Sequence, residues 1–448
     1  MVAVGRNPSR RASFMSFLRG PRGQRLVATV VGLFVQMVLN APAPASELAP
    51  EPWAGGPSYW SQFPQTKAAG WDNPAFFPIA VWFAGVGSAD DAATDRAAGL
   101  NTYIWLTGNS DVTFIRSADM FLIDQQQHRV GRGRETIAFG VEDEGDMKYG
   151  PGDAEWSGVP ESKSCRPVTA GCGYTAIETL AAGFPKDGHP LYANVGKGVM
   201  FWQTDAQAAR FVNHVTHFIS ADMYWYSDND SCIPSQGGHL IKGGWDRQLS
   251  ALECHRASNY GITVDRMRKL DAMDGKLQPV FSFVEDGHPG SGKGPVLIDG
   301  PELQGAVMSS LIHGAAGIIY FNHSFGGPCI SANVMRDKCG AEIRPYIVEI
   351  NRIIKELAPV LNTQSLSWNA NPRLDTMLKR DASGTYYLFA QQNLEATGTY
   401  ELSLPTVLAS AGAAEVLYEN RVASVTDGKL RDSFAAEYSW HVYKFSAR

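Results

Sequence analysis

The sequence predicts a (β/α)₈ barrel followed by a small antiparallel β-sandwich. The chain has 448 residues, which fits a barrel of about 250–320 residues plus a smaller domain. Up to residue 361, apolar strand-like runs alternate with helical patterns, and this alternation indicates a parallel sheet. Beyond it, short alternating stretches are typical of antiparallel strands. We therefore expect a barrel over 46–364 and a β-sandwich over 365–448.

The first 45 residues read as an export leader. Arginines surround a short apolar run at 26–39, and Ala43-Pro44-Ala45 offers a small-residue cleavage site. We expect a signal peptide over 1–45, a mature chain from Ser46, and a secreted, periplasmic or cell-envelope location. The apolar run is too short to span a bilayer. An uncleaved anchor is the alternative, and Ser9-Arg10-Arg11 partly matches a twin-arginine signal.

The charge argues against polyanionic partners. The leader carries six arginines and no acidic residue, so its removal takes the formal net charge from −6 to −12. An acidic surface disfavours nucleic acid and anionic membranes. The sequence does not predict an oligomeric state.

The six cysteines fit an exported protein. They form three local couples, and of the possible connectivities we favour the sequential one. The expected disulfides are Cys165/Cys172, Cys232/Cys254 and Cys329/Cys339. No couple has zinc-type spacing, so we expect neither a metal nor a cofactor.

The barrel strands are expected as near-continuous apolar runs, because strands covered on both faces have this pattern. They are predicted at 76–83, 101–106, 118–123, 136–144, within 190–201, and at 218–226, 279–285 and 317–321. The helices are predicted at 89–98, 175–182, 206–214, 247–270 with a break near Gly261, 301–313 and 346–361. Sandwich strands are predicted at 385–391, 399–404, 414–418 and 438–445. An open doubly wound sheet is the alternative, disfavoured because no Gly-x-Gly-x-x-Gly follows the first strand.

The fourth strand ends in a run of acids. Within 137–141 bulky residues alternate with small ones, and period-2 alternation then turns Glu142 and Glu144 toward the barrel axis. Neighbouring acids repel one another, which raises at least one pKa. A carboxyl with a raised pKa suits protonation of a glycosidic oxygen. The alternative is an acidic, solvated loop.

The seventh strand, Val280-Phe281-Ser282-Phe283-Val284, ends at Glu285. A lone carboxylate at the end of an apolar strand requires a partner or a function. The alternative is a salt-bridged strand terminus.

Taken together, glutamates at the ends of strands four and seven resemble the clan A retaining glycoside hydrolases. The stretches FFPIAVW, EDEGD, PVFSFVEDG and HGAAGIIYFNHSF resemble the clan's strands one, four, seven and eight. The tail VLYENRVASVTDGKLRDSFAAEYSWHVYKF looks like the β-sandwich that often closes these chains. The resemblance implies Glu285 as nucleophile and Glu144, rather than Glu142, as acid/base.

Two positions depart from the clan's pattern. Asp143 precedes Glu144 where many members have Asn, and strand eight ends Tyr320-Phe321-Asn322-His323 where many have Trp. These departures leave the individual family and the sugar open.

Other strand ends supply candidate substrate-binding residues. Each has a structural alternative in core packing, and a strand-six tyrosine could also hold Glu285 ionised. The candidates are Trp82, Trp105, Asn194, Tyr224, Tyr226, Asp228, Asn322 and His323.

The predicted function is therefore hydrolysis of an extracellular or cell-wall oligo- or polysaccharide. A non-catalytic carbohydrate-binding barrel and a different hydrolase on the same fold are the alternatives. No Gly-x-Ser-x-Gly elbow is present for a serine nucleophile. We expect the C-terminal domain to carry no catalytic group.

Overall fold

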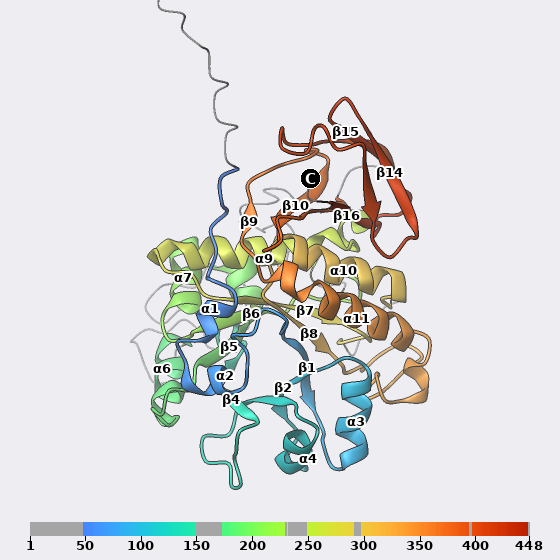
Figure 1. The fold of residues 1–448 in the computed structure, drawn as a ribbon. Coiled ribbons are helices and arrows are strands. Elements are labelled where there is room, and N and C mark those ends of the chain that lie inside the picture. Colours follow the sequence, from blue (N-terminus) through green and yellow to red (C-terminus); the bar gives the residue numbers. More distant parts are fainter. Residues whose placement is uncertain are drawn as a thin grey trace, which may run out of the picture. The chain divides into compact units, whose positions relative to one another are not determined.

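The computed structural model describes residues 48–148, 150, 173–228, 231, 249–290, 297–393 and 397–446. Eight parallel strands close into a barrel in sequential order (Figure 1). They are β1 (Ile79–Ala84), β2 (Thr102–Leu106), β3 (Phe121–Asp124), β4 (Thr136–Asp143), β5 (Leu191–Val195), β6 (Phe218–Ala221), β7 (Val280–Glu285) and β8 (Gly317–Phe321). The predicted barrel is confirmed.

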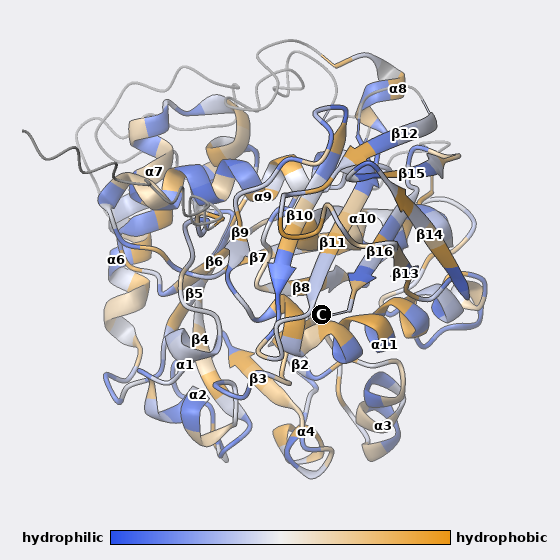
Figure 2. Cartoon of the chain, turned by 45° about the horizontal axis from the view of Figure 1, so that its top comes forward, coloured by the Kyte–Doolittle hydropathy of each residue, from blue (hydrophilic) through white to orange (hydrophobic). Residues whose placement is uncertain are grey.

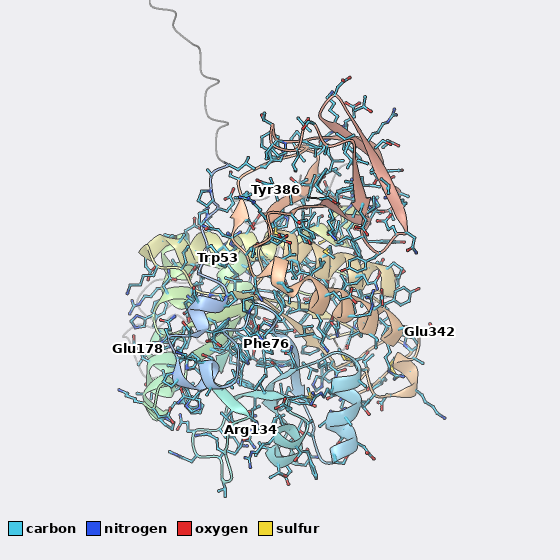
Figure 3. The ribbon with its side chains drawn as sticks, in the orientation of Figure 1. Trp53, Phe76, Arg134, Glu178, Glu342 and Tyr386 are labelled. Carbon is cyan, nitrogen blue, oxygen red and sulfur yellow. A yellow bond between two sulfur atoms is a disulfide. The ribbon has the colours of Figure 1, made fainter. Side chains whose placement is uncertain are left out.

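The interior of the barrel is filled by side chains, as in other closed parallel barrels. Ile104, Phe281 and Ile319, from three different strands, belong to one buried cluster. At the amino-terminal end of the strands, α1 (Pro57–Trp60) and α2 (Pro64–Ala68) supply a plug. There Trp60 packs edge-on against Trp71 at 5.0 Å, next to the ring of Phe76 (Figure 3). The barrel interior is therefore closed at this end, and a functional site is expected at the opposite end, where the strands have their carboxyl ends.

Helices follow the strands and cover the outside of the barrel. They are α3 (Ala89–Ala97), α4 (Val112–Ser117), α5 (Gly145–Lys148), α6 (Gly173–Gly183), the π-helix η1 (Gly198–Trp202), α7 (Asp205–Asn213), α8 (Ala251–Cys254), α9 (Ser258–Asp271), the 3₁₀ turn η4 (Ala272–Asp274), α10 (Gly300–Ile312), the 3₁₀ turn η5 (Lys338–Gly340) and α11 (Arg344–Leu361). Hydrophobic and hydrophilic residues mix along α11 (Figure 2), as on a helix with one buried face.

Two sequence predictions in this region are wrong in detail. The predicted helix break near Gly261 lies instead at 255–257, and Gly261 sits inside α9. A Cβ on Gly261 would lie 2.2 Å from His313 Cδ2, so this glycine allows α9 to pack closely on the end of α10. The predicted sixth strand, 218–226, ends at Ala221, and the residues after it form a loop at the barrel mouth.

The C-terminal domain is an eight-stranded antiparallel sheet in the order β12-β15-β14-β13-β16-β11-β10-β9. Its strands are β9 (Ser365–Leu366), β10 (Leu374–Arg380), β11 (Tyr386–Gln392), β12 (Gly398–Ser403), β13 (Ala413–Val416), β14 (Arg421–Thr426), β15 (Lys429–Phe434) and β16 (Trp440–Phe445). The four predicted stretches correspond to β11, β12, β13 and β16. β10 and β11 pack on α10, and Phe389 and Val442 belong to the same buried cluster as the outer face of the barrel.

The structure contains the predicted disulfide Cys329–Cys339, which closes a loop after β8. Cys254 is also disulfide-bonded. Its predicted partner Cys232, and the predicted pair Cys165/Cys172, lie outside the described residues. In the part of the chain that the structure describes, no helix is long and apolar enough to cross a membrane.

Candidate active site

The carboxyl ends of the barrel strands surround a cavity of about 390 Å³. Barrel active sites lie at this end, because the loops that follow the strands supply side chains there. The cavity is lined by Trp82, Asp143, Glu144, Met147, Asn194, Lys197, Asp222, Tyr224, Asp228, Pro289, Gly290 and Phe321.

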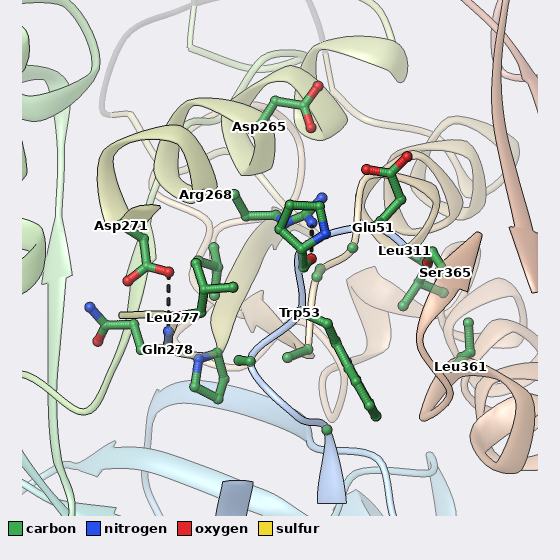
Figure 4. Close-up of a pocket in the computed structure, with 18 of the residues that line it drawn as sticks. Glu51, Trp53, Asp265, Arg268, Asp271, Leu277, Gln278, Leu311, Leu361 and Ser365 are labelled. Atoms are coloured by element: carbon green, nitrogen blue, oxygen red, sulfur yellow. Dashed lines mark hydrogen bonds between the residues drawn. The ribbon is translucent and has the colours of Figure 1, made fainter. Parts of the chain in front are cut away.

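A second cavity of about 420 Å³ lies at the amino-terminal end of the strands (Figure 4). Three of its charged groups are engaged in structural contacts. Asp271 accepts a hydrogen bond from the backbone N–H of Gln278 at 3.1 Å, and Arg268 donates to the carbonyl of Pro52 at 2.9 Å. Asp265 pairs with a histidine at 2.8 Å. The two cavities are similar in size, so the chemistry of their walls distinguishes them.

An irregularity in β4 redirects the side chains at its end. Gly140 lies opposite Tyr192 of β5, but the next pair is Asp143 opposite Asn194. β4 therefore holds one more residue than β5 over this stretch. Such a β-bulge breaks the alternation of faces along a strand, and bulges are common beside active sites.

As a result, Asp143 and Glu144 line the cavity and Glu142 does not. Glu142 instead accepts a hydrogen bond from Lys148 Nζ at 3.2 Å. The prediction that Glu142 and Glu144 share one inward face is therefore wrong. Glu144 itself has φ of +52°, a conformation that costs a non-glycine residue about 1–3 kcal/mol and persists mainly at functional sites.

Three carboxyl groups meet in the wall of this cavity. Asn194 Nδ2 donates to Asp143 Oδ1 and to Asp222 Oδ1, both at 3.0 Å. The side chains of Asp222 and Glu144 are hydrogen-bonded to each other. Ser220 fixes the amide by donating to Asn194 Oδ1 at 2.8 Å. Two carboxyl groups can share a hydrogen bond only when one of them carries the proton.

The environment keeps this cluster protonated beyond the usual range of a carboxyl. Burial, and then the charge of Glu144, raises the pKa of Asp143 to about 6. Burial and the charge of Asp146 raise the pKa of Glu144. Burial, followed by the charges of Glu144 and Asp143, raises the pKa of Asp222 well above its ordinary value. The cluster therefore holds a proton to higher pH than an isolated carboxyl group does.

The nearby cations are held by other acids. Lys197 Nζ lies 2.9 Å from Asp228 Oδ2, and both residues line the cavity. Lys148 pairs with Glu142 outside it. Among the described residues, none of the three clustered carboxyl groups forms a salt bridge. The lysines still lower the pKa of Glu144 from a distance, but burial outweighs them.

The end of β7 holds Glu285 in a different environment. Phe281 and Phe283 face the barrel interior, while Val280 and Val284 pack in the outer cluster, so alternation puts Glu285 on the interior side. Its side chain is fully buried and does not line the cavity. Burial raises its pKa to about 7, against the effect of its hydrogen bonds.

Four donors surround the Glu285 carboxylate. Oε1 accepts from the backbone N–H of Tyr226 at 3.1 Å and of Ser227 at 3.2 Å, and from Ser227 Oγ at 3.1 Å. Oε2 accepts from the hydroxyl of Tyr260 in α9. As predicted, a tyrosine that follows β6 holds Glu285: Tyr226 does so through its backbone N–H, while the tyrosine hydroxyl at Glu285 comes from Tyr260 of α9.

Tyr224 connects the two strand ends. It lines the cavity, and its pKa is raised well above the ordinary value by burial and then by the charges of Asp222, Glu144, Asp143 and Glu285. Its ring packs 4.9 Å from that of Phe321 and 6.4 Å from that of Phe283. The phenol therefore lies within electrostatic reach of both glutamates.

Of the two predicted tryptophans, only Trp82 lines the cavity. Trp105 packs against it at 4.8 Å and crosses Gly140 of β4, where a Cβ would lie 2.0 Å from the indole nitrogen. Trp105 has φ of +62°, a strained conformation that turns the indole onto its neighbour. Trp105 therefore packs on the Trp82 ring and helps to hold it in place.

The predicted substrate-binding residues divide into two groups. Asn194, Tyr224 and Asp228 line the cavity with Trp82. The hydroxyl of Tyr226 turns away, toward Glu437 of the C-terminal domain.

The two candidates after β8 also lie outside the cavity lining. Asn322 accepts a hydrogen bond from the backbone of Met335 at 3.0 Å, and thereby holds the loop that follows β8. His323 contacts the Phe83 carbonyl at 3.2 Å, so it joins β8 to β1. Both have structural roles.

Sequence reasoning did not single out Lys197, Asp222 and Tyr260, and it named Asp143 and Phe321 only as departures from the clan's pattern. Asp222 comes directly after β6, and a shorter sixth strand would have placed it at the mouth. Tyr260 lies inside a helix, where local pattern offers no signal. In the described ranges, no group of three or more His, Cys, Asp or Glu side chains is arranged to hold a metal ion.

No model of a known protein family matches the chain, and curated proteins give no match in sequence. Among solved structures, the chain is similar to a family 39 glycoside hydrolase from Bacteroides cellulosilyticus, with 11% identity, a TM-score of 0.48 and coverage of 83% of this chain and 82% of that one. A structure described as a glycoside hydrolase gives 11% identity, a TM-score of 0.46 and coverage of 82% and 92%. An Anoxybacillus α-amylase gives 12% identity, a TM-score of 0.42 and coverage of 84% and 99%.

Proposed function

We propose that this chain is a secreted glycoside hydrolase that cleaves O-glycosidic bonds of an oligo- or polysaccharide with retention of configuration. One observation carries the proposal. Glu144 and Asp222 form a hydrogen-bonded carboxyl pair in the wall of a cavity that also has an aromatic wall. Burial raises the pKa of both carboxyl groups, and a carboxyl with a raised pKa is the group that glycoside hydrolysis needs as general acid.

In the first step, Glu144 donates its proton to the glycosidic oxygen while the bond to the anomeric carbon breaks. The proton passes to the leaving alcohol, and the hydrogen bond to Asp222 then stabilises the Glu144 carboxylate. In the second step Glu144 accepts a proton from water, which attacks the anomeric carbon and breaks the bond between that carbon and the nucleophile, whose carboxylate is released. Burial raises its pKa, which favours the protonated form that the first step needs, and the hydrogen bond from Asp222 favours the carboxylate that the second step needs.

Glu285 is the proposed nucleophile, since its four donors stabilise the charged form that must attack. Double displacement needs two carboxyl groups about 5–5.5 Å apart. Because Glu285 does not line the cavity, the proposal includes a rotamer change at Tyr224 when a sugar binds, which leaves the hydrogen bonds of Glu285 in place. Attack on the anomeric carbon then forms a glycosyl ester as the leaving oxygen takes the proton.

The aromatic wall supports the choice of substrate class. Trp82, Tyr224 and Phe321 line the cavity opposite polar groups such as Asn194 and Lys197. A sugar ring presents apolar C–H faces and a rim of hydroxyls, and a site with flat apolar walls and a few polar groups complements both.

The test is hydrolysis of a glycan panel by the purified chain, measured as new reducing ends, with Glu144→Gln as the inactive control. ¹H NMR of the first-formed anomer then gives the stereochemistry, and retention is expected. Inversion would move the second role from Glu285 to Asp143 or Asp222, which line the cavity themselves.

A non-catalytic carbohydrate-binding barrel is the second candidate. The full burial of Glu285 and its four hydrogen-bond donors favour it, since such a carboxylate is also a stable structural element. Calorimetric binding of an oligosaccharide without product release at any pH would establish this alternative.

We also propose that the chain works outside the cytoplasm. The disulfides at Cys254 and Cys329–Cys339 support export, because reducing compartments keep thiols reduced. Peptide mapping without reduction, and N-terminal sequencing that finds Ser46 first, would test this; free thiols would contradict it.

A further inference from the structure

One carboxylate of the C-terminal domain reaches into the barrel. Glu437 lies in the connection between β15 and β16 and is mostly buried. It accepts a hydrogen bond from the Tyr226 hydroxyl, and its Oε2 accepts from the backbone N–H of Ala257 at 2.9 Å. Both donors belong to the barrel.

Each donor belongs to an element that also holds Glu285. The backbone N–H of Tyr226 donates to Glu285 Oε1 at 3.1 Å. Ala257 precedes α9, and Tyr260 in the first turn of that helix donates its hydroxyl to Glu285 Oε2. The rings of Tyr226 and Tyr260 stack, with centroids 6.0 Å apart and planes 24° apart. Glu437 therefore connects the two segments that hold Glu285, which are the loop after β6 and the beginning of α9.

The packing beside Glu437 fits a built contact. A Cβ on Gly305 of α10 would lie 2.6 Å from Tyr438 Cβ and 3.0 Å from Ala257 Cβ, so glycine lets the β15–β16 connection approach the barrel. Gln391 of β11 donates to the Gly305 carbonyl at 3.0 Å and anchors the same place. The C-terminal domain is thus fixed to α10 of the barrel next to Glu437.

We propose that Glu437 is a positioning residue for Glu285, supplied to the barrel site by the C-terminal domain. The inference rests on the proposed function, in which Glu285 is the nucleophile. Without Glu437 the Tyr226 hydroxyl and the Ala257 N–H lose their acceptor, so the loop after β6 and the beginning of α9 are free to shift. Displacement of a catalytic group by about 1 Å can cost a hundredfold in rate.

The loss also changes the charge balance at Glu285. Weaker donation to the carboxylate disfavours its ionised form, so the pKa of Glu285 rises above about 7 in the variant. In a plot of activity against pH, the rise on the acidic side (the acid limb) then moves to higher pH. Other groups facing Glu285 are Tyr224, Tyr260, Asp286 and Glu302; those facing Glu437 are Tyr226, Arg256, Asp299 and Glu302.

Glu437→Gln is the test variant, because the amide keeps the shape but presents an N–H₂ to one of the two donors. We expect kcat to fall about 10–100-fold with KM within about twofold, together with the shift of the acid limb. Tyr226→Phe removes only the hydrogen bond from the Tyr226 hydroxyl to Glu437, so kcat should fall less than in Glu437→Gln. The control is Glu419→Gln, which breaks a salt bridge with Arg421 in the same domain and should leave kcat and the profile unchanged.

A second readout does not depend on turnover. Infrared difference spectra follow protonation of Glu285, assigned by the band that Glu285→Gln removes. A higher pKa in Glu437→Gln is expected; an unchanged pKa, or parental kcat and profile in the folded variant, would overturn the inference. If the wild-type chain hydrolyses no glycan, the proposed function fails, while the infrared titration still decides whether Glu437 positions Glu285.

Discussion

The ends of β4 and β7 each carry a glutamate with a raised pKa, Glu144 partly buried and Glu285 fully buried, but they hold these glutamates differently. Glu144 lies among acids, with Asp143 and Asp222 in the same wall, and has strained backbone geometry. Glu285 lies among donors, with two backbone N–H groups and two hydroxyls around its oxygens. Burial raises the pKa of both glutamates, and their hydrogen-bonding and charged neighbours differ.

The difference lies in what each site does to a proton. Neighbouring carboxylates disfavour a further negative charge, so the β4 end retains a proton. Hydrogen-bond donors favour the negative charge, so the β7 end releases its proton more readily than burial alone would permit. The neighbours at the β4 end thus favour a protonated carboxyl group and those at the β7 end favour a carboxylate, and the variants below test this division.

The largest expected effect is at Glu285. Glu285→Ala should reduce kcat on the order of 10⁵-fold or more, because removal of a covalent nucleophile eliminates the chemical step. Added azide should not restore a product of retained configuration. Steady-state rates on a hydrolysed glycan measure the loss, and near-parental activity would remove Glu285 from the mechanism.

Glu144 should matter less and depend on the leaving group. Glu144→Gln should lower kcat about 10²–10⁴-fold on natural glycans, the usual contribution of general acid catalysis. Aryl glycosides with good leaving groups should keep a fast first step, and azide should rescue the second step in Glu144→Ala. Glu142→Gln is the matched control, since Glu142 pairs with Lys148 outside the cavity. The opposite result would move the acid/base role by two residues.

Asp222→Asn tests the shared proton. The amide can still donate to Glu144, but the pair loses one titrating group, and its upper macroscopic pKa disappears. The alkaline limb of kcat/KM should therefore move to lower pH. If the alkaline limb moves by one pH unit, kcat/KM at pH values above the limb should fall about tenfold. A limb that stays in place would show that Glu144 keeps its proton without Asp222.

Much of the fold could be predicted from local pattern. Barrel strands are continuous apolar runs because both faces are buried, and β8 is found at its predicted residues, Gly317–Phe321. The C-terminal strands β9, β10, β14 and β15 were not predicted. β14, for example, alternates in burial, but Val422 lies on its exposed face, so its sequence lacks the apolar-polar alternation that marks a strand.

The candidate site was predictable only in part, because its geometry depends on contacts between distant segments. Glu144 and Glu285 follow from strand-end position. The orientation of Glu142 depends on a bulge that only the pairing of β4 with β5 reveals. Tyr260 and Glu437 reach the site from a helix and from another domain, and no period within either segment marks them.

Tyr260→Phe probes one of the four donors at Glu285. Loss of a hydrogen bond to a charged group costs about 1.5–3 kcal/mol, and here the loss falls on the ionised form. The pKa of Glu285, about 7 in the parent, should rise. Activity requires the carboxylate, so the acid limb of kcat/KM should move to higher pH while the rate on the plateau changes little. A limb unchanged in Tyr260→Phe would show that the backbone donors suffice.

The smallest expected effect is on stability, next to Glu285 on the other face of β7. Asp286 is buried, and neither of its carboxylate oxygens has a hydrogen-bond partner among the described residues. Burial, and then the charge of Glu285, raises its pKa well above the ordinary value. An acid with a raised folded-state pKa costs stability as pH climbs above its unfolded pKa, about 3.9 for aspartate.

Asp286→Asn removes this cost, so the free energy of unfolding should increase by about 1–2 kcal/mol at neutral pH and hardly at all near pH 4. Urea unfolding at both pH values measures the difference. Asp146→Asn is the matched control, because Asp146 is equally buried but accepts hydrogen bonds from the backbone of Gly196 and Val199. That variant should lose stability. If Asp286→Asn is also destabilised at neutral pH, the ionised form of Asp286 has a stabilising partner, and the β7 end holds two carboxylates instead of one.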